Sequence, residues 1–306
     1  MEGRRMKMWH ALAGTQRSEE VSGRPYLPVS VVVPTKNEEA NLGRCLRSLE
    51  GFDEVIVVDS DSTDSTKSIA AAYHATVLNF KWNGIFPKKR NWCLRSHRCR
   101  NEWVLFVDAD EYVTEAFKRE IAVVIENTKL VGFWVTYENR FMGRRLRHGV
   151  RFRKLSIFRL GSGEYEQIDE EDWSELDMEV HEHPVLCGKV GRLSSRIIHE
   201  DFKGLGAFIA RHNEYASWEA HRYLVLRSDP KVWRILTPRQ RIKYRLMNTW
   251  CFAPGYFLYS YFALLGFLDA REGFVFSLLK LMYFLQVKIR IGEAFAAAPP
   301  QPVLPF

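Results

Sequence analysis

Two carboxylates, Asp108 and Asp110, are the sharpest chemical feature of the sequence. They end the run EWVLFVDAD (Glu102–Asp110), which predicts a buried strand, and residues i and i+2 of a strand face the same side. Two carboxylates on one side repel unless a cation neutralises them, and oxygen ligands suit Mg²⁺ or Mn²⁺. Such an ion could screen the charge of a diphosphate leaving group. The alternative is that the two acids only cap the following helix.

Polar residues also follow two earlier predicted strands. Thr35-Lys36-Asn37 follows VSVVVPT (Val29–Thr35), and Asp59-Ser60-Asp61 follows DEVIVVD (Asp53–Asp59). Ligands of parallel α/β sheets bind at the carboxyl ends of the strands, so all three sets should converge on one crevice. Asp59 is then a candidate acceptor for a nucleobase N–H or for ribose hydroxyls. The alternative is that Asp59 caps the turn Ser62–Thr66.

The elements that must position these residues alternate between strands and helices. A third strand is predicted at Ala75–Phe80, and helices are predicted at about 37–49, from Asp64 or Ser65 to Ala72, and at Lys89–Ser96. Repeated β-α-β units of this spacing indicate a parallel, doubly wound sheet.

The pattern changes after about residue 130. Strands that are antiparallel in part are predicted at 131–142, at 154–160 and near Glu179–Leu186, and the chain is mostly helical from about 204.

Composition excludes several classes of protein. The chain has 306 residues, 46% of them hydrophobic, and a formal net charge of +7, which excludes a disordered chain. Its five cysteines are scattered without a CxxC pair, so neither a zinc site nor a disulfide framework is expected and a reducing compartment is favoured. Residues 1–27 contain no apolar signal-peptide core and are expected to form a flexible tail, and the Pro-rich residues 296–306 a disordered one.

Charge is distributed unevenly along the second half. Residues 164–182 carry ten acids and no Lys or Arg, and are expected to form a solvated face. Residues 231–268 carry six basic groups and no acid, and residues 246–268 carry no charge at all. We expect a basic amphipathic helix after Pro238 and two apolar helices, around 250–268 and 273–287, that lie in the cytoplasmic leaflet. The alternative is a helical hairpin packed on the catalytic domain, or a dimer interface.

Four segments taken together resemble a known family. They read VSVVVPTKNEEANLGRCLRSL, DEVIVVDSDSTDST, KKRNWCL and EWVLFVDADEYV, in this order. Over roughly residues 28–200 the chain is similar to the family 2 inverting glycosyltransferases of the GT-A fold. Within that family it most resembles the lipopolysaccharide core β-glucosyltransferase group, through Glu179-Val-His181-Glu182, through SSRIIHED and through its C-terminal helical segment.

The resemblance implies an α/β fold with a Rossmann-like, mostly parallel sheet and helices on both faces. Residues 28–203 would form the GT-A catalytic domain, with a nucleotide-sugar half at 28–128 and an acceptor half at 129–203. Residues 204–295 would form a helical, amphipathic region that associates with a membrane.

The resemblance also implies the site residues. Those implied to bind the nucleotide sugar are Pro34, Thr35, Asn37, Glu38, Asp59, Lys89, Arg90, Asn91 and Asp108. Those implied to bind Mg²⁺ or Mn²⁺ are Asp110, Asp108 and His199. The chain departs from many relatives at Ser60, which replaces an acid, and at Asp61, which replaces a glycine.

An inverting transfer needs one general base, because the acceptor hydroxyl loses a proton as it attacks the anomeric carbon. Glu182 stands where the family's catalytic acid is expected, and Glu179 and Asp172 are its rivals.

The expected activity is transfer of a hexose from a nucleotide-diphosphate sugar, with UDP as the expected nucleotide, to a lipid-linked or glycolipid acceptor of bacterial surface polysaccharide or lipopolysaccharide. The enzyme is expected in the cytoplasm, bound peripherally to the inner face of the membrane through residues 231–290. Two alternatives stay open: a nucleotidyltransferase, although no glycine-rich loop follows strand one, and a binding protein without turnover. The basic run carries no nucleic-acid motif, so no nucleic acid partner is expected.

Overall fold

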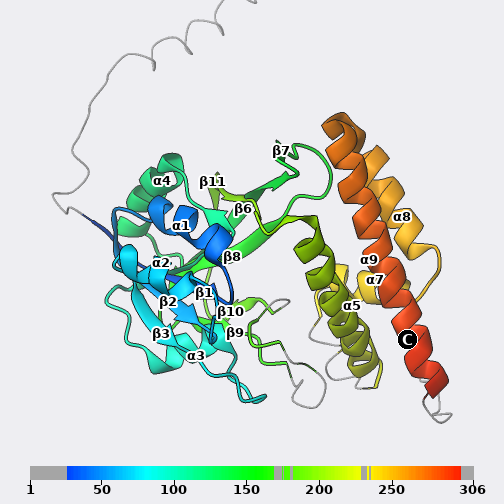
Figure 1. The fold of residues 1–306 in the computed structure, drawn as a ribbon, viewed down its shortest axis with the longest axis horizontal. Coiled ribbons are helices and arrows are strands. Elements are labelled where there is room, and N and C mark those ends of the chain that lie inside the picture. The colour runs from blue at the N-terminus through cyan, green and yellow to red at the C-terminus, as the bar shows by residue number, and fades with distance from the viewer. Residues whose placement is uncertain are drawn as a thin grey trace, which may run out of the picture.

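The structure is a computed structural model that describes residues 26–168, 174, 176–179, 182–228, 233 and 236–297. A twisted nine-stranded sheet lies beside a group of long helices (Figure 1). Most of both predicted tails lies outside the described residues, but Leu27 already belongs to the first strand and Ala296 to the last helix.

The first half alternates strands and helices as the sequence predicts. Its elements are β1 (Leu27–Thr35), α1 (Glu39–Ser48), β2 (Phe52–Asp59), α2 (Thr66–Ala72), β3 (Thr76–Asn79), α3 (Lys89–Ser96) and β4 (Trp103–Phe106). Strands β3, β2, β1 and β4 are neighbours in this order and all pair in parallel. The parallel arrangement brings the carboxyl ends of these strands to one edge, as expected for a doubly wound sheet.

The second half extends the same sheet. Its elements are β5 (Glu111–Tyr112), α4 (Glu115–Glu126), β6 (Gly132–Phe141), β7 (Arg144–Arg145), β8 (Arg153–Arg159), β9 (Gly163–Tyr165), β10 (Pro184–Leu186) and β11 (Val190–His199). Strand β8 runs antiparallel to both β4 and β6, and β11 runs parallel to β6. The predicted antiparallel contribution is therefore confirmed, and β9 and β10 form a separate two-stranded sheet.

Two predicted strands differ from the structure, and one strand of the structure was not predicted. The strand expected over Glu102–Asp110 ends at Phe106, because the amide of Glu111 donates to the carbonyl of Asp108 at 2.9 Å and turns the chain. Asp108 and Asp110 thus leave a turn instead of one face of a strand. The strand expected near Glu179–Leu186 is confined to Pro184–Leu186, and the long strand β11 was missed because polar residues interrupt its apolar pattern.

Helices cover both faces of the sheet. On one face, Leu42 of α1 and Phe117 of α4 pack with Val31 and Val33 of β1 in one hydrophobic cluster. On the other face, Cys93 of α3 belongs to a cluster with the β1, β2 and β4 residues that point the opposite way, such as Val32. The predicted α/β fold with a mostly parallel, two-faced sheet is confirmed.

The C-terminal region is helical, as predicted. It contains α5 (Gly204–Ser228), α7 (Pro238–Met247), α8 (Phe252–Leu258), the π-helical turn η1 (Tyr259–Ala263), the 3₁₀ turn η2 (Gly266–Asp269) and α9 (Ala270–Ala297). Its hydrophobic cluster is separate from those of the sheet and includes Tyr223, Met247 and Val287. Helix α7 begins with a capping box, in which Thr237 and Gln240 bond each other's backbone amides.

The apolar segments of this region are divided differently from the prediction. The segment 250–268 contains three short elements, and 273–287 lies inside the single helix α9. Among the described residues, no helix is both long and apolar enough to cross a membrane.

Candidate active site

The carboxylate of Asp59 lies at the end of β2 and is completely buried. It accepts hydrogen bonds from the Thr35 hydroxyl at 3.0 Å and from the Ser62 hydroxyl and amide at 2.5 and 3.0 Å. Lys67 adds an ion pair at 3.3 Å. Burial acts to raise the pKa of Asp59, but the Ser62, Thr35 and Lys67 contacts outweigh it and lower the pKa. Asp59 is therefore ionised, and it holds the turn that follows its own strand.

The loop after β1 is tied to the loop after β2. Asn37 has a left-handed φ of 54°, and its side-chain oxygen accepts from the Thr63 amide at 2.9 Å. Asp61 has a φ of 49°, so it adopts the conformation for which many relatives have glycine. Pro34 is buried in β1 opposite Val58 of β2. The first two predicted strand ends therefore meet, as expected.

Three consecutive basic residues at the start of α3 each bind one acid of the acidic segment 164–182. Lys88 pairs with Glu182 at 3.1 Å, and Lys89 pairs with Asp177 at 3.2 Å. Arg90 donates from its guanidinium to the carbonyl of Glu179. The predicted solvated face is therefore wrong for Asp177, Glu179 and Glu182, because these acids are drawn onto a buried basic cluster. The rival base Asp172 and the neighbouring His181 lie outside the described residues.

Glu179 and Glu182 make different contacts, and these contacts indicate different roles. Glu179 is fully buried and accepts from the amides of Arg90 and Asn91 at 2.8 and 2.9 Å, so it caps α3. The Asn91 side chain bonds both the amide and the carbonyl of Tyr165 and holds β9. Glu182 is 5% exposed, and its carboxylate accepts from the ammonium of Lys88 at 3.1 Å.

Lys89 connects the acidic segment with the nucleotide side of the crevice. Its ammonium donates to the carbonyl of Thr35 at 2.9 Å, besides its pair with Asp177. Burial lowers the pKa of Lys89, while Asp177 and Asp59 oppose that effect. The structure thus brings Lys89 next to Thr35 and Asp59, as the resemblance implies.

A cluster of three acids follows β4. Single carboxylate oxygens of Asp108, Asp110 and Glu111 all lie within 4.8 Å of one another. Lys154 of β8 contacts both Asp108 and Glu111, the latter at 2.6 Å, and Arg90 contacts Asp108 at 2.5 Å. Glu111 belongs to the set of polar residues expected after the fourth strand, whereas Lys154 was missed by sequence reasoning. Glu111 directly follows the acid pair in DADE, whereas Lys154 lies 43 residues further on and is brought there only by the β4–β8 pairing.

The charges of this cluster are unevenly distributed. Burial acts to raise the pKa of Asp108, but Lys154 and Arg90 outweigh it and hold the pKa well below its usual range. Burial raises the pKa of Glu111 to about 7, and the nearby Asp108 and Asp110 add to this rise. Asp108 thus forms ion pairs with two cations, whereas Glu111 is almost completely buried.

His199 ends β11 and faces Asp110 across the antiparallel pairing of β11 with β5. Its Nε2 lies 3.4 Å from Oδ2 of Asp110. Burial acts against both charges, yet their mutual attraction raises the pKa of His199 and lowers that of Asp110. The structure therefore brings together the three residues for which the resemblance implies metal binding.

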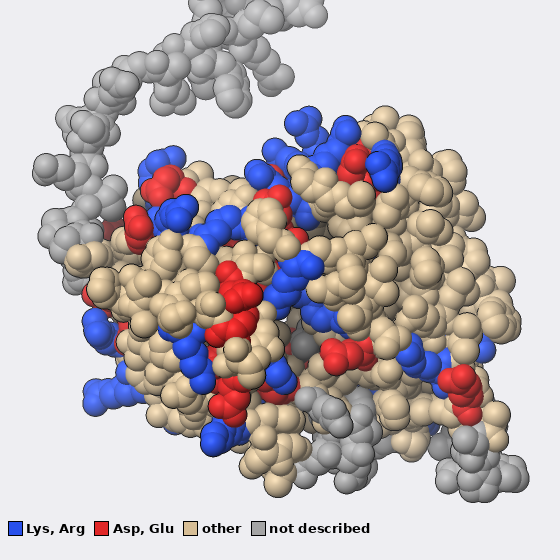
Figure 2. Space-filling view, viewed as in Figure 1, with Lys and Arg blue, Asp and Glu red and all other residues tan. Residues whose placement is uncertain are grey.

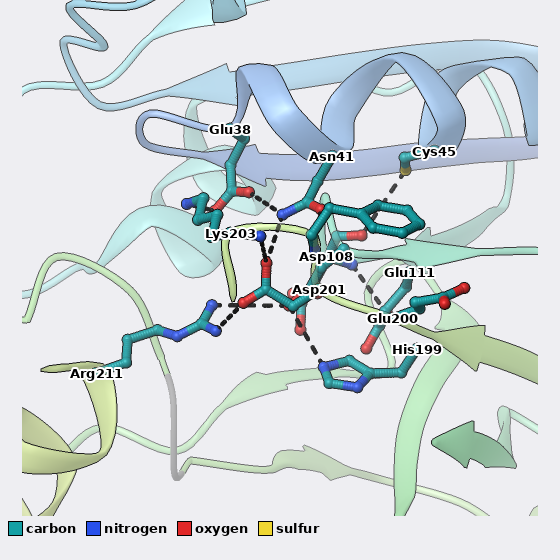
Figure 3. A network of polar contacts seen from close by, with 12 residues as sticks. Glu38, Asn41, Cys45, Asp108, Glu111, His199, Glu200, Asp201, Lys203 and Arg211 are labelled. Carbon is teal, nitrogen blue, oxygen red and sulfur yellow. Dashed lines mark hydrogen bonds and ion pairs between the residues drawn. The ribbon is translucent and has the colours of Figure 1, made fainter. Parts of the chain in front are cut away.

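A polar network joins this acid cluster to α1 and α5. Asp201 accepts from the Asn41 side chain at 2.9 Å and pairs with Arg211 of α5 (Figure 3). Lys203 binds Glu38, one of the predicted nucleotide-sugar residues, at 2.6 Å. The segment after β11 thus connects both sides of the crevice.

A large cavity lies elsewhere on the molecule. It has a volume of about 1120 Å³ and is lined by residues at the start of β1 and β4, including Leu27, Asn101 and Trp103. Because these are the amino ends of the parallel strands, the cavity lies at the opposite edge from the acid cluster.

Comparison with known proteins gives the family of this domain. Residues 30–181 match the sequence model of glycosyl transferase family 2. The chain is 27% identical over 272 residues to the lipopolysaccharide core biosynthesis glycosyltransferase LpsC of Rhizobium meliloti. The aligned region covers 83% of this chain and 91% of LpsC.

Two solved structures are also similar. Residues 1–349 of TarS from S. aureus align with a TM-score of 0.41 at 18% identity, covering 88% of this chain and 91% of that one. Glucosyl-3-phosphoglycerate synthase from Mycobacterium tuberculosis, solved with Mn²⁺ and UDP-glucose, aligns with a TM-score of 0.30 at 28% identity. This alignment covers 37% of this chain and 43% of that one. The family match extends from β1 through the acid cluster to the acidic segment, and through this domain the chain belongs to glycosyl transferase family 2.

Proposed function

We propose that this chain is an inverting hexosyltransferase that uses a nucleotide-diphosphate sugar, with UDP as the nucleotide. Its acceptor is a lipid-linked or glycolipid intermediate of bacterial surface polysaccharide or lipopolysaccharide. The observation that carries the proposal is the cluster of Asp108, Asp110 and Glu111 in a glycosyl transferase family 2 domain. The similarity to LpsC over most of both chains supports the lipopolysaccharide assignment.

The donor set fits Mg²⁺ or Mn²⁺, which prefer carboxylate oxygens and, for Mn²⁺, accept imidazole. Asp110 and His199 are the better-placed ligands, since Asp108 is already bound by Arg90 and Lys154. An ion held there would screen the negative charge of the diphosphate. Lys154 keeps Asp108 and Glu111 from repelling each other. Asp108, which Arg90 and Lys154 hold in place, contacts the ribose or the ion through its remaining carboxylate lone pairs.

The nucleoside side of the pocket is formed by Thr35, Asn37 and Asp59, together with Pro34 and Glu38. The ionised Asp59 is an acceptor for a base N–H or a ribose hydroxyl. Lys89 and Arg90 supply positive charge beside it for the donor. Asn91 acts indirectly, because both ends of its side-chain amide bond the backbone of Tyr165. It thereby fixes α3 against β9.

Glu182 is the general base of this proposal. Its rival Glu179 caps α3. If the carboxylate of Glu179 turned to the acceptor instead, two buried amides would lose their hydrogen-bond acceptors. Lys88 holds the carboxyl group of Glu182 in place through an ion pair at 3.1 Å, and a carboxylate so positioned can take a proton from the acceptor hydroxyl. The acceptor would enter from the side of the acidic segment.

A membrane surface would deliver such an acceptor. An apolar surface is formed by six side chains that are 42% to 54% exposed: Leu258, Tyr259, Phe262, Phe267, Leu268 and Phe274. Figure 2 shows a largely uncharged face over α8 and α9, with basic residues at its upper edge near β7. Arg144 and Arg145 of β7 are both exposed there. Apolar side chains beside cations suit the interface of an anionic leaflet, here the inner face of the cytoplasmic membrane.

The proposal is tested by calorimetric titration of the purified chain with UDP in Mn²⁺ and in EDTA, for the wild type and for Asp110→Ala. We expect binding that requires the metal and is lost in the variant. Incubation with UDP-hexoses and glycolipid acceptors then tests turnover. Binding of UDP without any transfer would favour a binding protein, and absence of binding to UDP, GDP and dTDP would overturn the proposal.

A further inference from the structure

Arg211 is a cation that the C-terminal helical region contributes to the acid cluster. It lies on α5, and its Nη1 is 3.7 Å from Oδ2 of Asp110. Its Nη2 pairs with Oδ2 of Asp201. The side chain is 30% exposed, so it lies at the rim of the crevice and not in the core of the helices.

Arg211 is held in place by a rigid neighbour. Asp201 accepts from the Asn41 side chain at 2.9 Å and from the Lys203 amide at 2.9 Å. The guanidinium therefore rests on a carboxylate that α1 and the chain after β11 both fix. Such pre-orientation is what makes a charged group effective toward a developing charge, since little reorganisation is needed.

The two contacts of Arg211 are not equivalent. Its approach to Asp201 is a close ion pair, whereas 3.7 Å to Asp110 exceeds hydrogen-bond distance. The Nη1 atom of the planar guanidinium thus lies near Asp110 and His199, the pair proposed to bind the metal, without a hydrogen bond to Asp110. Guanidinium groups bind phosphate oxygens in a bidentate manner, and a diphosphate on this pair is the ligand that such a fork recognises.

We propose that Arg211 binds the diphosphate of the donor and stabilises the charge of the leaving nucleotide, so that α5 completes the donor site. This inference rests on the proposed function. It also gives the C-terminal region a part in catalysis that is independent of any membrane contact. The contrary interpretation is that Arg211 only fastens α5 to Asp201.

The two interpretations are separated by a matched pair of variants. Arg211→Ala removes the guanidinium, whereas Asp201→Asn removes the ion pair but keeps the guanidinium and the shape of its neighbour. Arg211→Lys keeps the charge but not the planar fork. Binding of UDP in Mn²⁺ is measured by calorimetry, and binding of uridine, which has no phosphate, by ligand-observed NMR. Thermal unfolding of each variant verifies that it is folded.

We expect Arg211→Ala to weaken UDP binding at least about tenfold and to leave uridine binding unchanged. Arg211→Lys should recover part of the loss, and Asp201→Asn should keep UDP affinity within about threefold of the wild type. Equal losses in Arg211→Ala and Asp201→Asn, or unchanged UDP binding in Arg211→Ala, would overturn this inference alone. A wild type that binds no nucleoside diphosphate would overturn the proposed function and the inference with it.

Discussion

Arg90 contacts Asp108 at 2.5 Å, from Nη2 to Oδ1, and it also donates to the carbonyl of Glu179. One side chain on α3 therefore connects the acid cluster after β4 with the acidic segment that contains the proposed base. The guanidinium is buried, and its central carbon lies 5.3 Å from the centroid of the Tyr165 ring. This contact further fixes its orientation. The acid cluster and the segment that contains the proposed base are thus held together by the same residue.

Removing this cation should destabilise the fold. Arg90→Ala leaves the partly buried Asp108 beside Glu111 with one cation fewer, and the loss of such an ion pair costs up to about 3–5 kcal/mol of unfolding free energy. Arg95→Ala is the matched control, because Arg95 lies on the same helix but pairs with Glu164 at the surface. The control should cost less than about 1 kcal/mol. Urea denaturation measures both, and similar losses would contradict the structural role of Arg90.

Glu182→Gln should separate binding from chemistry. The amide keeps the shape of the side chain but cannot accept a proton, so transfer should fall by about 10²- to 10⁴-fold while UDP affinity is unchanged. Glu179→Gln is the comparison: it should lower stability by about 1–2 kcal/mol through the weakened cap of α3. Steady-state kinetics and calorimetry provide the measurements. Normal turnover by Glu182→Gln would exclude Glu182 as the base.

Two helical glycines should respond in opposite directions to substitution by alanine. A Cβ at Gly273 of α9 would lie 2.1 Å from the carbonyl oxygen of Gly266, whereas a Cβ at Gly255 of α8 would meet nothing within 4 Å. Gly273→Ala should therefore cost about 1–3 kcal/mol, because η2 must move away from α9. Gly255→Ala should stabilise by about 0.5–1 kcal/mol. Thermal unfolding tests this, and equal effects would argue against close packing of η2 on α9.

The apolar surface should govern binding to membranes. The triple variant Leu258→Ser, Phe262→Ser and Phe267→Ser should weaken co-sedimentation with phosphatidylglycerol vesicles at least about tenfold, since three exposed apolar groups are lost.

A matched control for this experiment replaces Ile85, Val123 and Val185 with Ser. These three side chains are 52% to 63% exposed and belong to the catalytic domain, away from α8 and α9. The control should bind vesicles as the wild type does. Equal loss in both variants, or no binding by the wild type, would refute the proposed membrane surface.

The sequence by itself determined the local elements of the first half. The strands β1 and β2 and the helix Lys89–Ser96 follow from continuous β-branched runs and from polar turns, which are properties of neighbouring residues. It also determined that Asp59, Asp108 and Asp110 meet at one edge, because parallel strands end on the same side of a sheet. The family resemblance added His199, whose nearness to Asp110 no local pattern predicts.

Only the tertiary structure decided how the charges are compensated. Lys154 reaches Asp108 because β8 pairs with β4. Arg211 reaches Asp110 because α5 follows β11, whose end pairs with β5 directly after Asp110. The acidic segment was expected to be solvated, since local charge density favours water. Instead Lys88 and Lys89 pair with Glu182 and Asp177, and the first amides of α3 bind the carboxylate of Glu179. Ion pairs between distant segments depend on how the chain folds back on itself, and a linear charge pattern contains no information about that.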